Sequence, residues 1–163
     1  MRAFKHITKN EDLELRKEFP ISTLEDINDN DAFTRIAISL WDKWYQDVID
    51  KENEPPFDCS DKEEQLRYEQ IASMTIDIVE KYEVYGIFYN KRNRLKKVRC
   101  KKQLIADLKR DVFLSRNLVI PSLRAIYTVT WDFTVFIYCK NEDDVQPLID
   151  IALSKGLKQI KYT

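Results

Sequence analysis

Apolar side chains at intervals of three and four residues predict the helices of this chain. The longest such pattern covers residues 31–49, and its apolar positions are Phe33, Ile36, Ala37, Leu40, Trp41, Trp44, Tyr45, Val48 and Ile49. A capping box, Ser60-Asp-Lys-Glu63, predicts the start of a second long helix, whose buried positions are Leu66, Ile71, Met74, Ile78 and Tyr82. Because the connection between these N-terminal helices is short, we expect them to pack as an antiparallel pair.

Three shorter segments also have helical patterns. Residues 10–19 combine an Asn that can cap a helix with acids in the first turn and a stop at Pro20. Residues 102–112 repeat leucine and isoleucine at helical spacing. A last helix opens at Asn141 and ends at Gly156, because glycine is best suited to the left-handed conformation that follows a helix.

Alternating and β-branched segments predict the strands. One hairpin joins residues 84–89 to 95–100, and a second joins residues 124–130 to 133–139. Residues 157–162 predict a final strand.

Residues 1–7 are expected to form an edge strand or to fray, and the stretch that Pro121 closes is expected to be irregular. Together these elements predict one α+β domain over residues 1–163. Its mainly antiparallel sheet, made of two hairpins and the C-terminal strand, packs with the N-terminal helix pair and the C-terminal helix.

The rare residue types argue against most catalytic sites. His6 is the one histidine, so a Ser-His-Asp or Cys-His set would have to use it. The three cysteines, Cys59, Cys100 and Cys139, form no C-x-x-C pair, and two glycines are too few for a phosphate-binding loop. We therefore expect no catalytic residue, no cofactor and no resident metal. A hydrolase that holds its metal with carboxylates is an alternative.

Charge divides the chain into two unlike halves. Residues 1–90 contain 11 basic and 21 acidic side chains, whereas residues 91–163 contain 16 basic and 7 acidic ones. Such asymmetry is a hint about partners. The structural alternative is that the two halves fold against each other and their fields cancel, or that both are solvated faces.

The acidic half predicts a surface for a cationic protein. Carboxylates steer association and aromatic side chains anchor the complex. The partner-binding candidates are Asp42, Trp44, Tyr45, Asp47, Asp50 and Glu54. Aromatic residues at helical spacing are also typical of a core.

The basic segment, residues 91–102, predicts the alternative of a nucleic-acid contact. Its candidates are Lys91, Arg92, Arg94, Lys97, Arg99 and Lys101. The last three are expected on one face of the returning strand of the first hairpin, opposite Val98 and Cys100.

The segment Arg124-Ala-Ile-Tyr-Thr-Val-Thr-Trp-Asp-Phe-Thr-Val-Phe-Ile-Tyr-Cys-Lys140, with residues 141–157 after it, resembles the closing hairpin, helix and strand of small bacterial immunity proteins. Those proteins inhibit contact-dependent or other polymorphic toxins in the cytosol. The resemblance implies a non-enzymatic inhibitor that binds one cognate toxin domain, often a nuclease.

No apolar stretch is long enough to span a membrane, and the first residues lack the apolar run of a signal peptide. We therefore expect a cytoplasmic protein without membrane contact. The leading hypothesis is an immunity protein or antitoxin that occludes the active site of its toxin. The alternatives are a nucleic-acid-binding regulator and a metal-dependent hydrolase.

Overall fold

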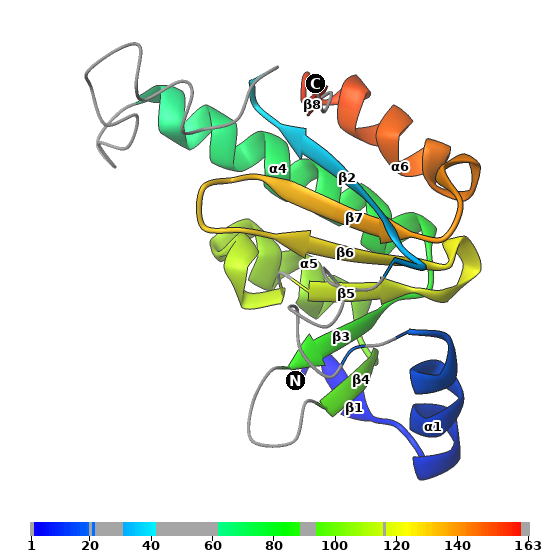
Figure 1. Cartoon of the computed structure of the whole chain (residues 1–163). Coiled ribbons are helices and arrows are strands. Elements are labelled where there is room, and N and C mark those ends of the chain that lie inside the picture. The colour runs from blue at the N-terminus through cyan, green and yellow to red at the C-terminus, as the bar shows by residue number, and fades with distance from the viewer. Residues whose placement is uncertain are drawn as a thin grey trace.

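Eight antiparallel strands form one sheet in the computed structural model, which describes residues 2–19, 21, 31–41, 62–88, 94–115 and 117–160. The strand order is β1-β4-β3-β5-β6-β7-β2-β8 (Figure 1). The strands are β1 (Phe4–His6), β2 (Thr34–Ser39), β3 (Tyr85–Phe88), β4 (Arg94–Val98), β5 (Asn117–Ile120), β6 (Ala125–Val129), β7 (Val135–Cys139) and β8 (Lys158–Ile160).

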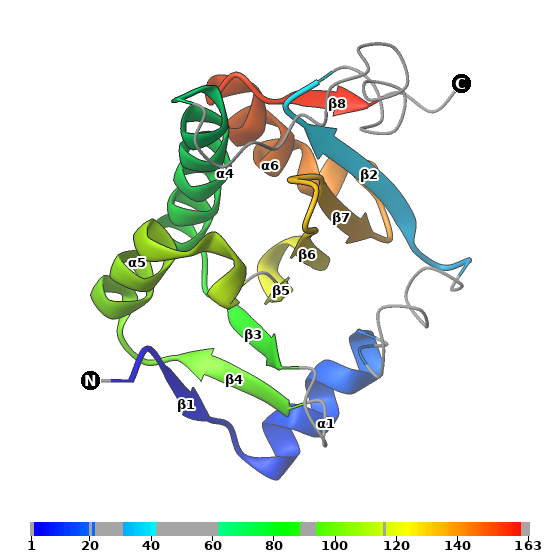
Figure 2. The ribbon, with the colours of Figure 1, turned by 90° about the vertical axis from the view of Figure 1, so that its left-hand side faces the viewer.

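Four α-helices lie within the described residues: α1 (Lys9–Glu18), α4 (Lys62–Lys81), α5 (Lys101–Arg110) and α6 (Glu142–Ser154). Two short 3-10 helices, η1 (Val112–Ser115) and η2 (Pro121–Leu123), flank β5. Figure 2 shows the sheet curving around α4, α5 and α6, whereas α1 lies outside the curve. The α+β class with an antiparallel sheet is therefore confirmed. No helix within these ranges has the length and apolar content to cross a membrane.

The inner face of the sheet holds the main core. Its fully buried side chains come from α4, α5, α6 and the central strands, and they include Ile71, Met74, Ile78, Leu104, Leu108, Leu118, Ile120, Tyr127, Val135, Ile137, Val145 and Leu148. Inside this core the hydroxyl of Tyr127 lies 2.7 Å from that of Thr75, which itself donates to the carbonyl of Ile71. Tyr127 is therefore the donor to Thr75, and this buried hydrogen bond joins α4 to β6.

The outer face has a smaller cluster. Phe19 and Ile21, which follow α1, pack with Tyr85, Ile87, Leu95, Val119, Ile126 and Tyr138. Residues of both clusters alternate along the strands, as side chains of a sheet covered on both faces must.

The predicted helix over residues 31–49 is wrong at residues 34–39, which form β2. Ile36 and Ile38 point to the inner core, while Ala37 between them is also buried. A run that is apolar on both faces has no clear period, and here β-branched side chains pack between β7 and β8. Residues 42–49 lie outside the described residues. No antiparallel helix pair made of residues 31–49 and α4 is therefore present in the described part of the chain.

Most other predicted elements are confirmed, with local corrections. Thr8, not Asn10, caps α1, because its hydroxyl accepts from the amide of Glu11 at 3.2 Å. Leu66 is exposed rather than part of the seam of α4. The stretch before Pro121, expected to be irregular, contains β5. Gly156 has a φ of +79° after α6, as predicted.

The predicted basic strand face is also wrong. The first hairpin exists, with Tyr85 opposite Lys97, but β4 ends at Val98. Arg99 lies in a bend, and Lys101 begins α5. The chain leaves the sheet because the amides of Arg99 and Cys100 both donate to the carbonyl of Ala3 instead of continuing the ladder.

Candidate interaction surfaces

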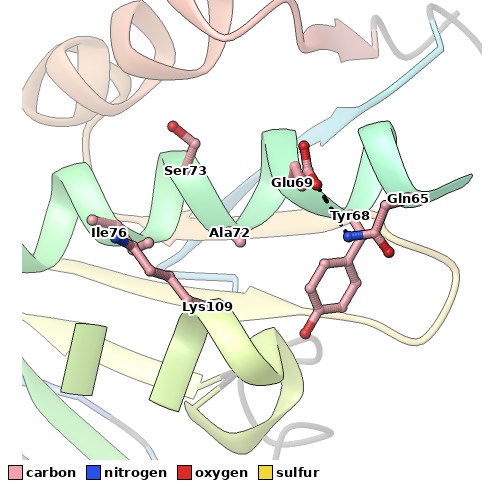
Figure 3. Close-up of a pocket in the computed structure, with 7 residues that line it drawn as sticks. All are labelled: Gln65, Tyr68, Glu69, Ala72, Ser73, Ile76 and Lys109. Atoms are coloured by element: carbon pink, nitrogen blue, oxygen red, sulfur yellow. Dashed lines mark hydrogen bonds between the residues drawn. The ribbon is translucent and has the colours of Figure 1, made fainter. Parts of the chain in front are cut away.

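A groove of about 390 Å³ runs between α4 and α5. Its lining residues are Gln65, Tyr68, Glu69, Ala72, Ser73 and Ile76 of α4 and Lys109 of α5. Figure 3 shows Tyr68 pointing from α4 toward α5, with Gln65 and Glu69 hydrogen-bonded along one wall. The floor is apolar, one wall carries a carboxylate and the other an ammonium group. We call this the α4–α5 groove.

An aromatic cluster adjoins the α4–α5 groove at Tyr68. The ring of Tyr68 lies 6.4 Å from that of Phe113 and 6.1 Å from that of Phe133. The Tyr68 hydroxyl accepts from the amide of Val112, which fixes η1 against α4. Burial raises the pKa of Tyr68 above its ordinary value. These contacts place the β6–β7 turn, which contains Phe133, directly beside the groove.

The β6–β7 turn is rigid and strained, and it presents Trp131. Asp132 accepts from the amide and the hydroxyl of Thr134, both at 3.1 Å, and from the hydroxyl of Thr130. Phe133 has a φ of +59°, a conformation that costs a non-glycine residue about 1–3 kcal/mol. The side chain of Trp131 is 71% exposed. The turn thus exposes a large aromatic ring two residues before Phe133, whose own ring packs against Tyr68 of the groove.

A basic surface forms where the first strand of the chain meets the basic segment. β1 pairs with β4, so that Lys5 lies opposite Lys97 and His6 opposite Lys96. The stretches on either side, residues 2–9 and 94–102, contain nine lysines and arginines and no Asp or Glu. We call these two stretches together the basic edge. Like charges directly opposite each other destabilise a strand pair, so this arrangement has an energetic cost.

Two of the predicted nucleic-acid-binding residues interact with other groups of the protein itself. Lys97 forms an ion pair with Glu83 at 2.8 Å. Lys101 donates to the carbonyls of Glu80 and Tyr82 at 2.9 and 3.3 Å. Arg99 is exposed. Lys91, Arg92 and the side chain of Arg94 lie outside the described residues.

Tyr85 links the basic edge to α1. Its hydroxyl reaches Glu11 at 2.9 Å and Glu83 at 3.2 Å. Burial, and next the hydrogen bond to Glu11, raise the pKa of Tyr85 to about 12. The hydrogen bond from Lys97 lowers the pKa of Glu83, and the same bond raises the pKa of Lys97. Glu83 and Lys97 are therefore both charged at neutral pH.

Sequence reasoning missed the contribution of β1. Arg2, Lys5 and His6 are exposed and belong to the basic edge, although they lie about ninety positions from β4. The available signal was the lack of acids in residues 2–9. The α4–α5 groove was missed as well, because no pattern in the sequence predicts which two helices leave a gap between them.

The predicted acidic site cannot be placed. Asp42, Trp44, Tyr45, Asp47, Asp50 and Glu54 all lie outside the residues that the structure describes. The neighbouring Trp41 is described, and the guanidinium of Arg67 lies 4.7 Å from its ring centre.

Buried polar groups offer little chemistry. The side-chain oxygens of Ser39, Asn117 and Thr128 are buried without a hydrogen-bond partner, and Asn117 lies opposite Thr128 across β5 and β6. Burial, and next the charges of Glu142 and Asp144, raise the pKa of the Cys139 thiol to about 11, so it is protonated at neutral pH. Within the described ranges, no three His, Cys, Asp or Glu side chains are grouped to hold a metal ion.

Comparisons with known proteins find no relative: no family model matches the chain, and neither the curated proteins nor the solved structures contain a significant match. The features of this chain that indicate a function are therefore the α4–α5 groove and the basic edge.

Proposed function

We propose that this protein is a non-enzymatic binding protein, an immunity protein or antitoxin, and that it docks a cognate toxin domain at the α4–α5 groove. The observation that carries the proposal is Trp131, 71% exposed on a strained and hydrogen-bonded turn whose Phe133 packs against Tyr68 of the groove. Tryptophan is enriched among the residues that dominate the energy of protein interfaces.

The rigidity of the turn supports this proposal. A turn that hydrogen bonds already hold in one backbone conformation loses less conformational freedom on binding, so more of the contact energy contributes to affinity. The backbone strain at Phe133 is offset by packing against Tyr68 and Phe113. Strained turns of this kind cluster where proteins bind their ligands.

The lining of the groove defines the complementary segment of the toxin. An apolar side chain fits over Ala72 and Ile76, a cation lies against Glu69, and an anion lies against Lys109. A toxin segment held in this way, together with the ring of Trp131, covers an extended surface. Occlusion of the toxin's active cleft by the bound inhibitor then prevents substrate entry.

The first test is complex formation with the purified product of the adjacent gene, followed by calorimetry. Trp131→Ala is expected to weaken the complex by at least about tenfold, which is typical of an interface hot spot. Leu153→Ala is the matched control, because Leu153 is also exposed, at 52%, but lies on α6 and lines no part of the groove. It is expected to change the affinity by less than about twofold.

Absence of a complex at both low and high salt would contradict the proposed function. A complex whose affinity is unchanged by Trp131→Ala would contradict the groove as its site. In that case, charge reversal at Asp42, Asp47 and Asp50 tests the acidic segment, because loss of steering carboxylates slows association and flattens its salt dependence.

A further inference from the structure

The basic edge lies on a different part of the molecule from the α4–α5 groove, and it has a different chemistry. We propose that the basic edge binds the phosphate backbone of a single-stranded nucleic acid. The proposal does not depend on the toxin-binding function, because none of the groove-lining residues belongs to the two basic stretches.

The pairing of β1 with β4 brings charges of one sign together in the basic edge. β1 and β4 come from distant parts of the chain, yet each carries cations and no acid where they pair. Glu83 neutralises Lys97 in an ion pair. In contrast, Lys5, Arg99 and Lys102 are exposed and form no ion pair with any described residue. These three cations can therefore be offered to a polyanion.

Two aromatic rings lie beside one cation of the basic edge, Lys96, on the face of the strands opposite to that of Lys5. On the inner face of the same strands, Phe4 and Phe88 form an edge-to-face pair with ring centres 5.2 Å apart. The ammonium group of Lys96 lies 4.4 Å from the ring centre of Phe88. Both rings are partly exposed. Sites for single strands combine cations that follow the backbone with rings on which bases stack.

The packing at Gly86 lies directly beneath the two rings. A Cβ at Gly86 would lie 2.8 Å from the ring of Phe4 and 2.9 Å from that of Phe88. Glycine at this position lets both rings lie close to the sheet. The two rings are thereby held beside Lys96 and next to β1, within the basic edge.

The experiment measures the affinity of the full chain for fluorescein-labelled single-stranded oligonucleotides of about a dozen nucleotides, as DNA and as RNA, over a range of salt concentrations. The logarithm of the affinity is expected to fall linearly with the logarithm of the salt concentration. The double variant Lys5→Gln with Arg99→Gln is expected to lower the slope by about 1.4, since each lost phosphate contact contributes about 0.7 for single strands. At low salt it should bind about tenfold more weakly.

The matched control is Lys140→Gln with Lys158→Gln, which removes the same charge from exposed positions near the opposite edge of the sheet. It should change the affinity by less than about twofold. An equal loss in both double variants would overturn the proposal, because net charge alone would then explain binding. Failure to bind at low salt would also overturn it, as would displacement of the oligonucleotide by polyglutamate at matched charge concentration.

Discussion

The α4–α5 groove and the basic edge use opposite physical means to present a surface. The groove lies between two helices, has an apolar floor, and carries charges of both signs on its walls. The basic edge lies on two strands, places cations opposite cations, and contains no acid. Contacts in the groove act at short range and depend on shape, whereas the field of the basic edge acts over about 10 Å and weakens with salt. Salt therefore separates the two binding activities.

The two surfaces also differ in what holds them. Tyr68, Phe113 and Phe133 pack against each other at the groove and join three elements. β1 has only three residues, and among the described strands it pairs with β4 alone. We therefore expect the basic edge to be lost more easily than the groove, and the three predictions below test this difference.

The largest effect is expected from Gly86→Val. The added side chain must displace the rings of Phe4 and Phe88, and overpacking of this kind costs about 1–3 kcal/mol. Chemical denaturation measures the loss in the free energy of unfolding. The affinity for the oligonucleotide should fall as well, whereas the affinity for any ligand of the groove should stay the same. Gln159→Val, on exposed β8, should change stability by less than about 0.5 kcal/mol. Equal stability of the two variants would contradict close packing at Gly86.

A smaller loss is expected from Tyr68→Phe. The ring cluster is kept, but the amide of Val112 loses its acceptor, which costs about 1 kcal/mol. Hydrogen exchange should show faster exchange in η1, with no change in β1 and β4. If exchange quickens equally at the basic edge, the two surfaces are coupled and the comparison fails.

The smallest effect has opposite signs for stability and binding. Lys5→Glu replaces a repulsive cross-strand pair with an attractive one to Lys97, which should stabilise the protein by about 0.2–1 kcal/mol at low salt. The same change should weaken binding of the oligonucleotide. Lys158→Glu on β8 lies opposite Ser39, so it gains no ion pair from that strand and serves as the control. A loss of stability in Lys5→Glu would show that the repulsion is already screened.

Local patterns predicted a large part of the fold. Both hairpins, α4, α5 and α6 were predicted correctly because each has a clear period together with turn or cap residues close in sequence. β2 was not predicted correctly. Ile36, Ala37 and Ile38 are all buried, and such an apolar run fits a helix as well as a strand. β5 was not predicted either, because it has only four residues, all of them buried, and shows no alternation after its first residue, Asn117.

The sequence by itself determined the α+β class, the mainly antiparallel sheet and the uneven distribution of charge, because these depend on residue types and on spacings within a few turns or strands. Only the tertiary structure decided that β1 pairs with β4 and adds its cations to the basic segment. It also decided that α4 and α5 leave a groove between them. Pairing across ninety residues depends on the burial of the whole sheet and on the entropy of closing a long loop, and a local pattern contains neither quantity.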